Sequence, residues 1–197
     1  MSVIDELVFD RTASDVERVT TLKQQIMTYG FNSLSASERQ EYLAGMKGAY
    51  NYTDMNRVGT AVQYLANRLI NAPDELDAYR AEKGVSDDPM FDLPYEADEI
   101  EVSPKTDWSV SDIPTQSQAA IYLGNISNLW SILTLPSETP SPPASLNALT
   151  FTVANNIEKI LAAIDEALSE AIAEKKALID LAGLKNTYSG EAYSGEF

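Results

Sequence analysis

The groups most able to take part in chemistry are carboxylates, which come from 30 acidic residues. Two carboxylic acids about 5 to 9.5 Å apart hydrolyse glycosidic bonds, and clustered carboxylates bind calcium. The densest acidic run, residues 87–101, lacks the spacing and the glycine of an EF-hand loop. Most other acids fall on the polar faces of expected helices, which favours solvated carboxylates. A hydrolase stays as an alternative that needs a cleft with converging acids.

The chain contains no histidine and no cysteine. This composition removes the commonest general base, the commonest metal ligand and all thiolate chemistry. It also rules out a disulfide framework. We therefore expect a protein that is not an enzyme and has no catalytic residues, no metal and no cofactor.

Acidic residues outnumber basic ones, and the formal net charge is −16. Nucleic acids and anionic membrane surfaces need clustered Lys and Arg, so neither is expected as a partner. The N-terminal residues lack the pattern of a signal peptide, and no run approaches the ~20 apolar residues of a membrane span. The apolar share of 44% is ordinary for a protein with a buried core.

Capping signals and apolar periodicity predict three helices within residues 1–71. The first is expected over residues 12–30, and a capping box at 35–38 starts a short second helix. Thr53 is expected to cap the third, over residues 54–71. One face of this helix is apolar: Met55, Val58, Val62, Leu65 and Leu69. Short connections favour antiparallel neighbours, so 1–71 is predicted to be one N-terminal helical unit.

The rest of the chain is predicted to divide into three parts. Residues 72–114 form an acidic, proline-containing crossover, partly docked through its apolar residues and with a short helix possible at 74–82. Residues 115–183 form a helix pair that packs on the first unit, and the second helix ends near Leu181. Asn156 on that helix is expected to be a buried amide that sets helix register. Residues 184–197 are an extended tail. The fold class is therefore mainly α, a bundle of about five helices with an acidic crossover and extended termini.

Five short segments, spread along the whole chain, carry a family resemblance. Residues 47–58, KGAYNYTDMNRV, are similar to a motif KGAYN-x-TDLNRV of small structural proteins from phages and prophages of gut Firmicutes. The other segments resemble that family's DRT-x-x-DV-x-RV, SPKTDW…DIPT, AN-x-IEKIL and YSGE-x-Y-x-GE motifs. They lie, in the same order as in the family, at residues 10–19, 103–115, 154–161 and 188–196.

The resemblance implies a non-enzymatic virion protein, associated with the tail or baseplate, that assembles with itself or with a neighbouring virion protein. It would be made in the bacterial host cytoplasm and reside in the virion, where a homo-oligomer is one option. The family implies no catalytic residues.

The repeated YSGE of the tail has two interpretations. It is either a flexible end or a segment that pairs with another chain by strand addition. In the second case the partner-binding residues are Tyr188, Glu191, Tyr193, Glu196 and, from the crossover, Trp108.

The alternative function is a carbohydrate- or cell-surface-binding module. It would use the aromatic residues Tyr52, Trp108 and Trp130. The same residue types also suit an aromatic core at helix junctions, which is the favoured interpretation.

Overall fold

The structure, a computed structural model, describes residues 2–147 and 149–191, with side chains as far as Leu184. These residues form five α-helices and no strand, which confirms the predicted mainly α bundle. The helices are α1 (Ala13–Tyr29), α2 (Ala36–Leu43), α3 (Tyr52–Glu82), α4 (Gln116–Ile132) and α5 (Phe151–Glu191). Four short 3₁₀ helices join them: η1 (Val3–Glu6), η2 (Phe31–Ser33), η3 (Pro89–Phe91) and η4 (Ala97–Glu99).

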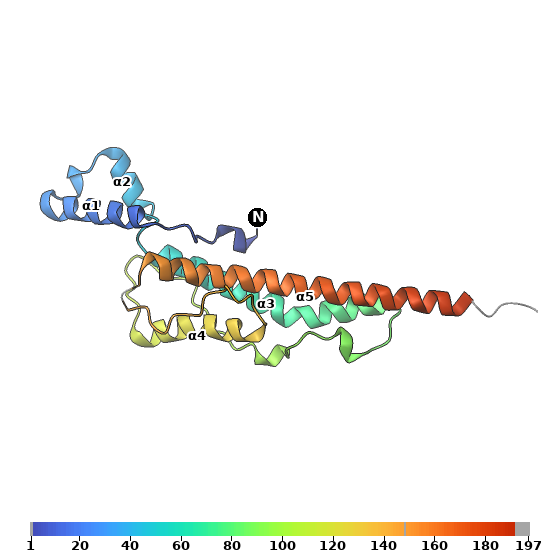
Figure 1. The fold of residues 1–197 in the computed structure, drawn as a ribbon. Coiled ribbons are helices and arrows are strands. Elements are labelled where there is room, and N and C mark those ends of the chain that lie inside the picture. The colour runs from blue at the N-terminus through green and yellow to red at the C-terminus, as the bar shows by residue number, and fades with distance from the viewer. Residues whose placement is uncertain (1, 148, 192–197) are drawn as a thin grey trace, which may run out of the picture.

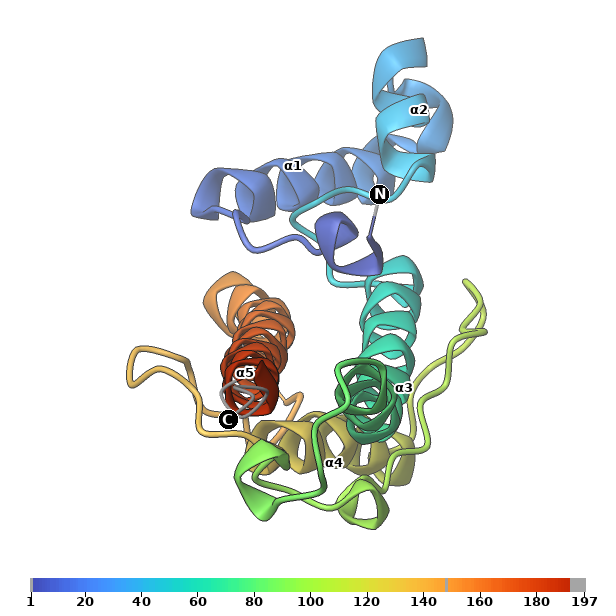
Figure 2. The same ribbon diagram turned by 90° about the vertical axis from the view of Figure 1, so that its right-hand side faces the viewer.

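The body of the molecule consists of α3, α4 and α5, which lie side by side (Figures 1 and 2). Polar pairs join α3 and α5 at a constant separation of 101 residues, at Arg57–Glu158, Glu75–Lys176 and Tyr79–Asp180. A constant offset means that the two helices run parallel, and in Figure 1 α4 runs in the same direction. Parallel neighbours need connections that return along the whole body, which accounts for the long segments 83–115 and 133–150.

Apolar side chains from all three long helices fill one core. Its fully buried members include Val58, Leu65, Leu69, Ile126, Leu129, Ile157, Ile160, Ile164 and Leu168. Each such side chain contributes roughly 1.5–3 kcal/mol through removal from water. The apolar stripes predicted for α3 and α5 are therefore the surfaces that hold the body together.

The N-terminal hairpin, residues 12–50, projects from one end of the body (Figure 1). Its helices α1 and α2 enclose a separate small core of Val19, Leu22, Leu34 and Met46. Helix α3 packs in the main core rather than with α1 and α2, whereas the prediction placed all three in one helical unit over 1–71. Val16 on α1 is 36% exposed. The capping boxes at 12–15 and 35–38 are confirmed.

Helix α3 begins and ends differently from the prediction. Asn51, not Thr53, is the N-cap, and its side chain accepts from the Thr53 N–H. The short helix expected at 74–82 is the continuation of α3 through Pro73. Proline has no N–H to donate to the carbonyl of Leu69, four residues earlier. The hydroxyl of Tyr95 donates to that carbonyl instead, at 3.0 Å.

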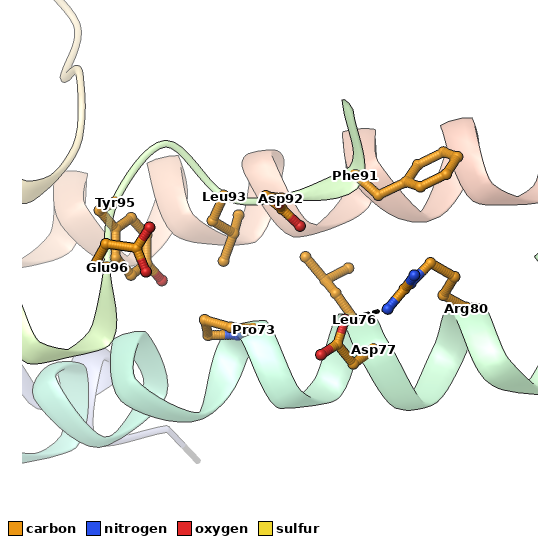
Figure 3. Close-up of a pocket in the computed structure, with 9 residues that line it drawn as sticks. All are labelled: Pro73, Leu76, Asp77, Arg80, Phe91, Asp92, Leu93, Tyr95 and Glu96. Atoms are coloured by element: carbon orange, nitrogen blue, oxygen red, sulfur yellow. Dashed lines mark hydrogen bonds and ion pairs between the residues drawn. The ribbon is translucent and has the colours of Figure 1, made fainter. Parts of the chain in front are cut away.

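Figure 3 shows Tyr95 on the crossover, across from Pro73 on α3. Burial raises the pKa of Tyr95 to about 12, so the hydroxyl keeps its proton at neutral pH. A buried carbonyl without a donor would cost about 1–3 kcal/mol. The crossover thus repairs the gap that Pro73 makes in the hydrogen bonding of α3.

The crossover, residues 83–115, is docked through asparagine side chains of the helices. Asn56 accepts from the N–H of Trp108 at 2.7 Å and donates to its carbonyl at 2.9 Å. Asn128 holds the backbone between Glu99 and Glu101 in the same way. Phe91, Leu93, Tyr95 and Trp108 of the crossover are buried in the main core, whereas Met90 is half exposed.

Within the described residues, both terminal regions contain helix that the predicted extended arms did not include. The N-terminal arm contains η1, and the following Leu7 is buried in the main core. At the other end α5 continues to Glu191, ten residues beyond the predicted end at Leu181. Residues 184–191 are therefore helical rather than extended. Residues 192–197 lie outside the described part of the chain.

Candidate functional site, a buried ion cluster beside a groove

Four charged side chains meet where the N-terminal arm crosses α3 and α5. Arg11 comes from the arm, Asp54 and Arg57 from α3, and Glu158 from α5. Two guanidinium groups and two carboxylates give the cluster a formal charge of zero. Glu158 is fully buried and Arg11 is 3% exposed, so little water screens these charges.

Glu158 is the centre of the cluster. Its two oxygens accept from Nε and Nη2 of Arg57, both at 2.9 Å, in a bidentate pair. Oε1 also accepts from Arg11 at 2.6 Å, and Oε2 accepts from the backbone N–H of Val8 at 2.6 Å. Charge-assisted and bidentate hydrogen bonds of this kind are the strongest that side chains form. The carboxylate therefore binds α3 and the N-terminal arm to α5.

Asp54 has two roles in the same place. Its Oδ2 accepts from the backbone N–H of Asn51 at 2.9 Å, which completes the capping box of α3. Its Oδ1 accepts from Arg11 at 2.7 Å and from Arg57, which lies three residues further along α3. The first turn of α3 is thus part of the cluster, and the negative charge also meets the positive end of the helix dipole.

The backbone of Arg11 is held by an amide rather than by a helix or a sheet. Asn155 accepts from the Arg11 N–H at 3.1 Å and donates to the Arg11 carbonyl at 2.9 Å. The predicted register amide was Asn156, which is only half-buried, so that assignment was off by one residue. The guanidinium of Arg11 lies 5.6 Å from the ring centroid of Tyr50, in a cation–π contact.

Tyr50 and Tyr122 close the cluster on the side of α4 through a hydrogen bond between their hydroxyls. Desolvation raises the pKa of both hydroxyls above the ordinary tyrosine value. Burial alone would lower the pKa of Arg11 and Arg57, but the hydrogen bonds and charges of Glu158 and Asp54 outweigh it and raise both values. The arginines therefore stay charged.

Three of the five family-like segments meet in this cluster, and a fourth lies against one of them. Arg11 comes from the first, Asp54 and Arg57 from the second, and Asn155 and Glu158 from the fourth. The third supplies Trp108, whose backbone is fixed by Asn56 of the second segment. The sequence patterns do not identify Arg11, Asn155 or Glu158 as site residues. The spacing at Glu158 is informative, because it lies three residues before the buried Leu161 and four after the buried Ala154 and therefore on the same face of the helix.

The charged groups of the cluster are paired with one another. Each carboxylate accepts hydrogen bonds from both arginines. Within the described residues, no three acidic side chains converge to hold a metal ion. In the same part of the chain no helix is both long and apolar enough to span a membrane.

A groove opens beside the cluster, between the N-terminal hairpin and the body. This junction groove has a volume of about 520 Å³, and its wall includes Val16, Val19, Lys23, Tyr50, Tyr52 and Trp108. Trp108 is 5% exposed, so its ring belongs mainly to the core and only part of it borders the groove. Tyr52 is 38% exposed and offers its ring to the groove.

The other predicted partner-binding residues lie elsewhere. Tyr188 and Glu191 are in the last turns of α5, beyond the described side chains. Tyr193 and Glu196 lie outside the described residues. A second cavity, between α3 and the crossover, is lined by Arg80, whose guanidinium pairs with Asp77 at 2.8 Å (Figure 3). The same guanidinium pairs with Asp87 at 2.5 Å. The carboxylates of Asp92 and Glu96 also line this cavity, so its remaining charge is negative.

Comparison of the chain with protein family models, with curated proteins and with solved structures gives no match in any of the three.

Proposed function

We propose that the protein is a non-enzymatic structural component of a phage or prophage virion, associated with the tail or baseplate. It acts through assembly with copies of itself or contact with a neighbouring virion protein. One observation carries the proposal. Charged residues from three of the family-like segments, Arg11, Asp54, Arg57 and Glu158, lie together in a neutral cluster that joins the N-terminal arm to α3 and α5.

The cluster favours an architectural role because of what it connects. Arg11 and Glu158 tie the base of the N-terminal hairpin to α3 and α5. A buried ion cluster of this kind specifies one geometry, because any other arrangement leaves a buried charge without a partner. An assembly protein needs such a fixed relation between its projecting parts.

A carbohydrate-binding module is the less favoured alternative. Stacking against a sugar needs exposed aromatic faces. Trp108 is buried, so only Trp130 on α4, which is 36% exposed, offers part of a tryptophan ring to solvent. A glycan array distinguishes the two functions. Binding that is lost on Tyr52→Ala would support the module, and a blank array would remove it.

Mass spectrometry of purified particles tests the proposal directly. Prophages are induced in a strain that carries the gene, and the particles are separated from free protein on a density gradient. We expect the protein to sediment with the major capsid and tail proteins at a constant ratio. Its absence from particles that are otherwise complete, while it is abundant in the lysate, would contradict the proposed function.

A further inference from the structure

The junction groove and the last turns of α5, where the tail (residues 187–197) begins, lie at opposite ends of that helix. Leu149 lines the groove, two residues before α5 begins. The tail starts in the last turn of the same helix. Because α5 has 41 residues, its two ends are ~60 Å apart. The five residue steps from Glu191 to Glu196 span at most ~18 Å. A tail therefore cannot enter the groove of its own chain.

The groove and the tail have complementary chemistry. Besides its apolar and aromatic wall, the groove contains Lys23, which is exposed and has no ion-pair partner among the described residues. Its one acid, Asp112, accepts from the N–H of Ser109 at 2.7 Å. The tail combines aromatic residues with acids, among them Tyr193 and Glu196.

Charge also favours the hairpin end of the molecule as the place where an acidic tail binds. Residues 12–50 contain four acidic and four basic residues, so the N-terminal hairpin is formally neutral. The remainder of the chain carries the whole net charge of −16. An incoming acidic segment is therefore repelled less at the hairpin than along the body.

We propose that the tail of one copy binds in the junction groove of the next copy, with Glu196 paired to Lys23 and an aromatic side chain against Tyr52. This inference rests on the proposed self-assembly and specifies its contact. Groove and tail are different surfaces, so the contact is heterologous, and repeating it without closure gives open chains of molecules. The mass of the assembly then grows with protein concentration and reaches no fixed oligomer.

A charge-swap experiment with the full-length chain tests the contact. Lys23→Glu and Glu196→Lys are each expected to weaken association about fivefold or more, measured by sedimentation velocity over a concentration series. Combining both changes in one chain restores the pair in reversed order and the association with it. An equimolar mixture of the two single variants also restores association, because every groove then finds a tail of opposite charge.

Matched variants separate this contact from general charge effects. Lys159→Glu makes the same change at another exposed lysine without an ion-pair partner, on α5, and is expected to leave association unchanged. Tyr52→Ala removes the exposed ring from the groove and is expected to weaken association about tenfold or more. Circular dichroism checks that each variant keeps the helical content of the wild-type protein.

The outcomes distinguish the contact from the proposed function. If the wild-type chain associates but neither charge variant weakens it, the tail–groove contact is wrong and self-assembly stands. If the wild-type chain stays monomeric and a labelled peptide of residues 187–197 does not bind it in fluorescence anisotropy, the contact is also overturned. Membership of the virion is decided separately, by the mass spectrometry of particles.

Discussion

At the scale of single residues, a few polar side chains hold segments that are far apart in sequence. Glu158 contacts Val8, Arg11 and Arg57, and Asn155 holds the backbone of Arg11. Both residues come from one turn of α5. Val8 and Arg11 lie outside any helix, so their backbone groups form hydrogen bonds with side chains of α5 instead of with other backbone groups.

Glu158→Gln is expected to destabilise the protein by about 3–5 kcal/mol, because the buried guanidinium of Arg11 and the half-buried one of Arg57 would then share one carboxylate. Urea denaturation followed by circular dichroism measures this change. Glu166→Gln makes the same change at an exposed position of α5 and should cost no more than about 0.5 kcal/mol. Equal stability of both variants would show that the cluster contributes nothing.

The hydroxyl of Tyr95 is expected to be coupled to Pro73. Tyr95→Phe leaves the Leu69 carbonyl without its donor and should cost about 1–3 kcal/mol. In a Pro73→Ala background residue 73 regains its N–H, which donates to Leu69, so the same change should cost about 1 kcal/mol less. Tyr64→Phe, where no hydrogen bond of the hydroxyl is involved, is the control. Additive effects in this double-mutant cycle would contradict the repair of α3 by the crossover.

At the scale of elements, the crossover is part of the folded body rather than a linker. Asparagines of α3 and α4 pair with its backbone at Trp108, Ser103 and the turn of η4. Gly59 allows the closest approach, since a Cβ at this position would lie 2.3 Å from the carbonyl oxygen of Lys105. The crossover therefore lies directly on the surface of α3.

Gly59→Ala is expected to displace the crossover and to destabilise the protein by about 1–3 kcal/mol. Gly124→Ala is the matched control, because this glycine is also inside a helix but nothing lies within 4 Å of the added Cβ. There the gain in helix propensity should stabilise the protein by about 0.5–1 kcal/mol. Thermal denaturation of both variants measures the two changes, and equal signs would contradict the close approach.

At the scale of the whole molecule, two cores of unequal size are joined by the ion cluster. The hairpin core has four buried apolar residues, whereas the main core extends along α3, α4 and α5. The lengths of the connections follow from the parallel arrangement of the three long helices, and the ion cluster ties the base of the hairpin to the body through Arg11. Within the hairpin, a Cβ added at Gly48 would lie 2.1 Å from the Asp15 carbonyl oxygen, so the start of α1 is tightly packed against the segment that leads to α3.

Hydrogen exchange is expected to show the difference between the two cores. Amides of α1 and α2 should exchange through local opening, at a lower free energy than amides in the middle of α3 and α5. Mass spectrometry of exchanged peptides over a range of urea concentrations measures both sets. Equal protection throughout would mean that the hairpin and the body unfold as one unit.

Local signals in the sequence were sufficient for the helices and for most of their ends. The capping boxes at Thr12, Ser35 and Thr115 involve residues three apart, so their geometry is decided within one turn. The apolar stripes of α3 and α5 likewise follow from the 3.6-residue period. These local effects determined the fold class and which helix faces are buried.

Only the tertiary structure decided which of those faces meet. Two contacts of this kind are the parallel pairing of α3 with α5 and the burial of Arg11 with Glu158, which join residues about 100 or more positions apart. The pairing of α3 with α5 also separates α3 from the hairpin unit. The free energy of such contacts depends on partners that no local pattern specifies. From the sequence alone, a charged residue is expected to be exposed to solvent. Charged residues are buried as a cluster only when folding brings opposite charges into contact away from water.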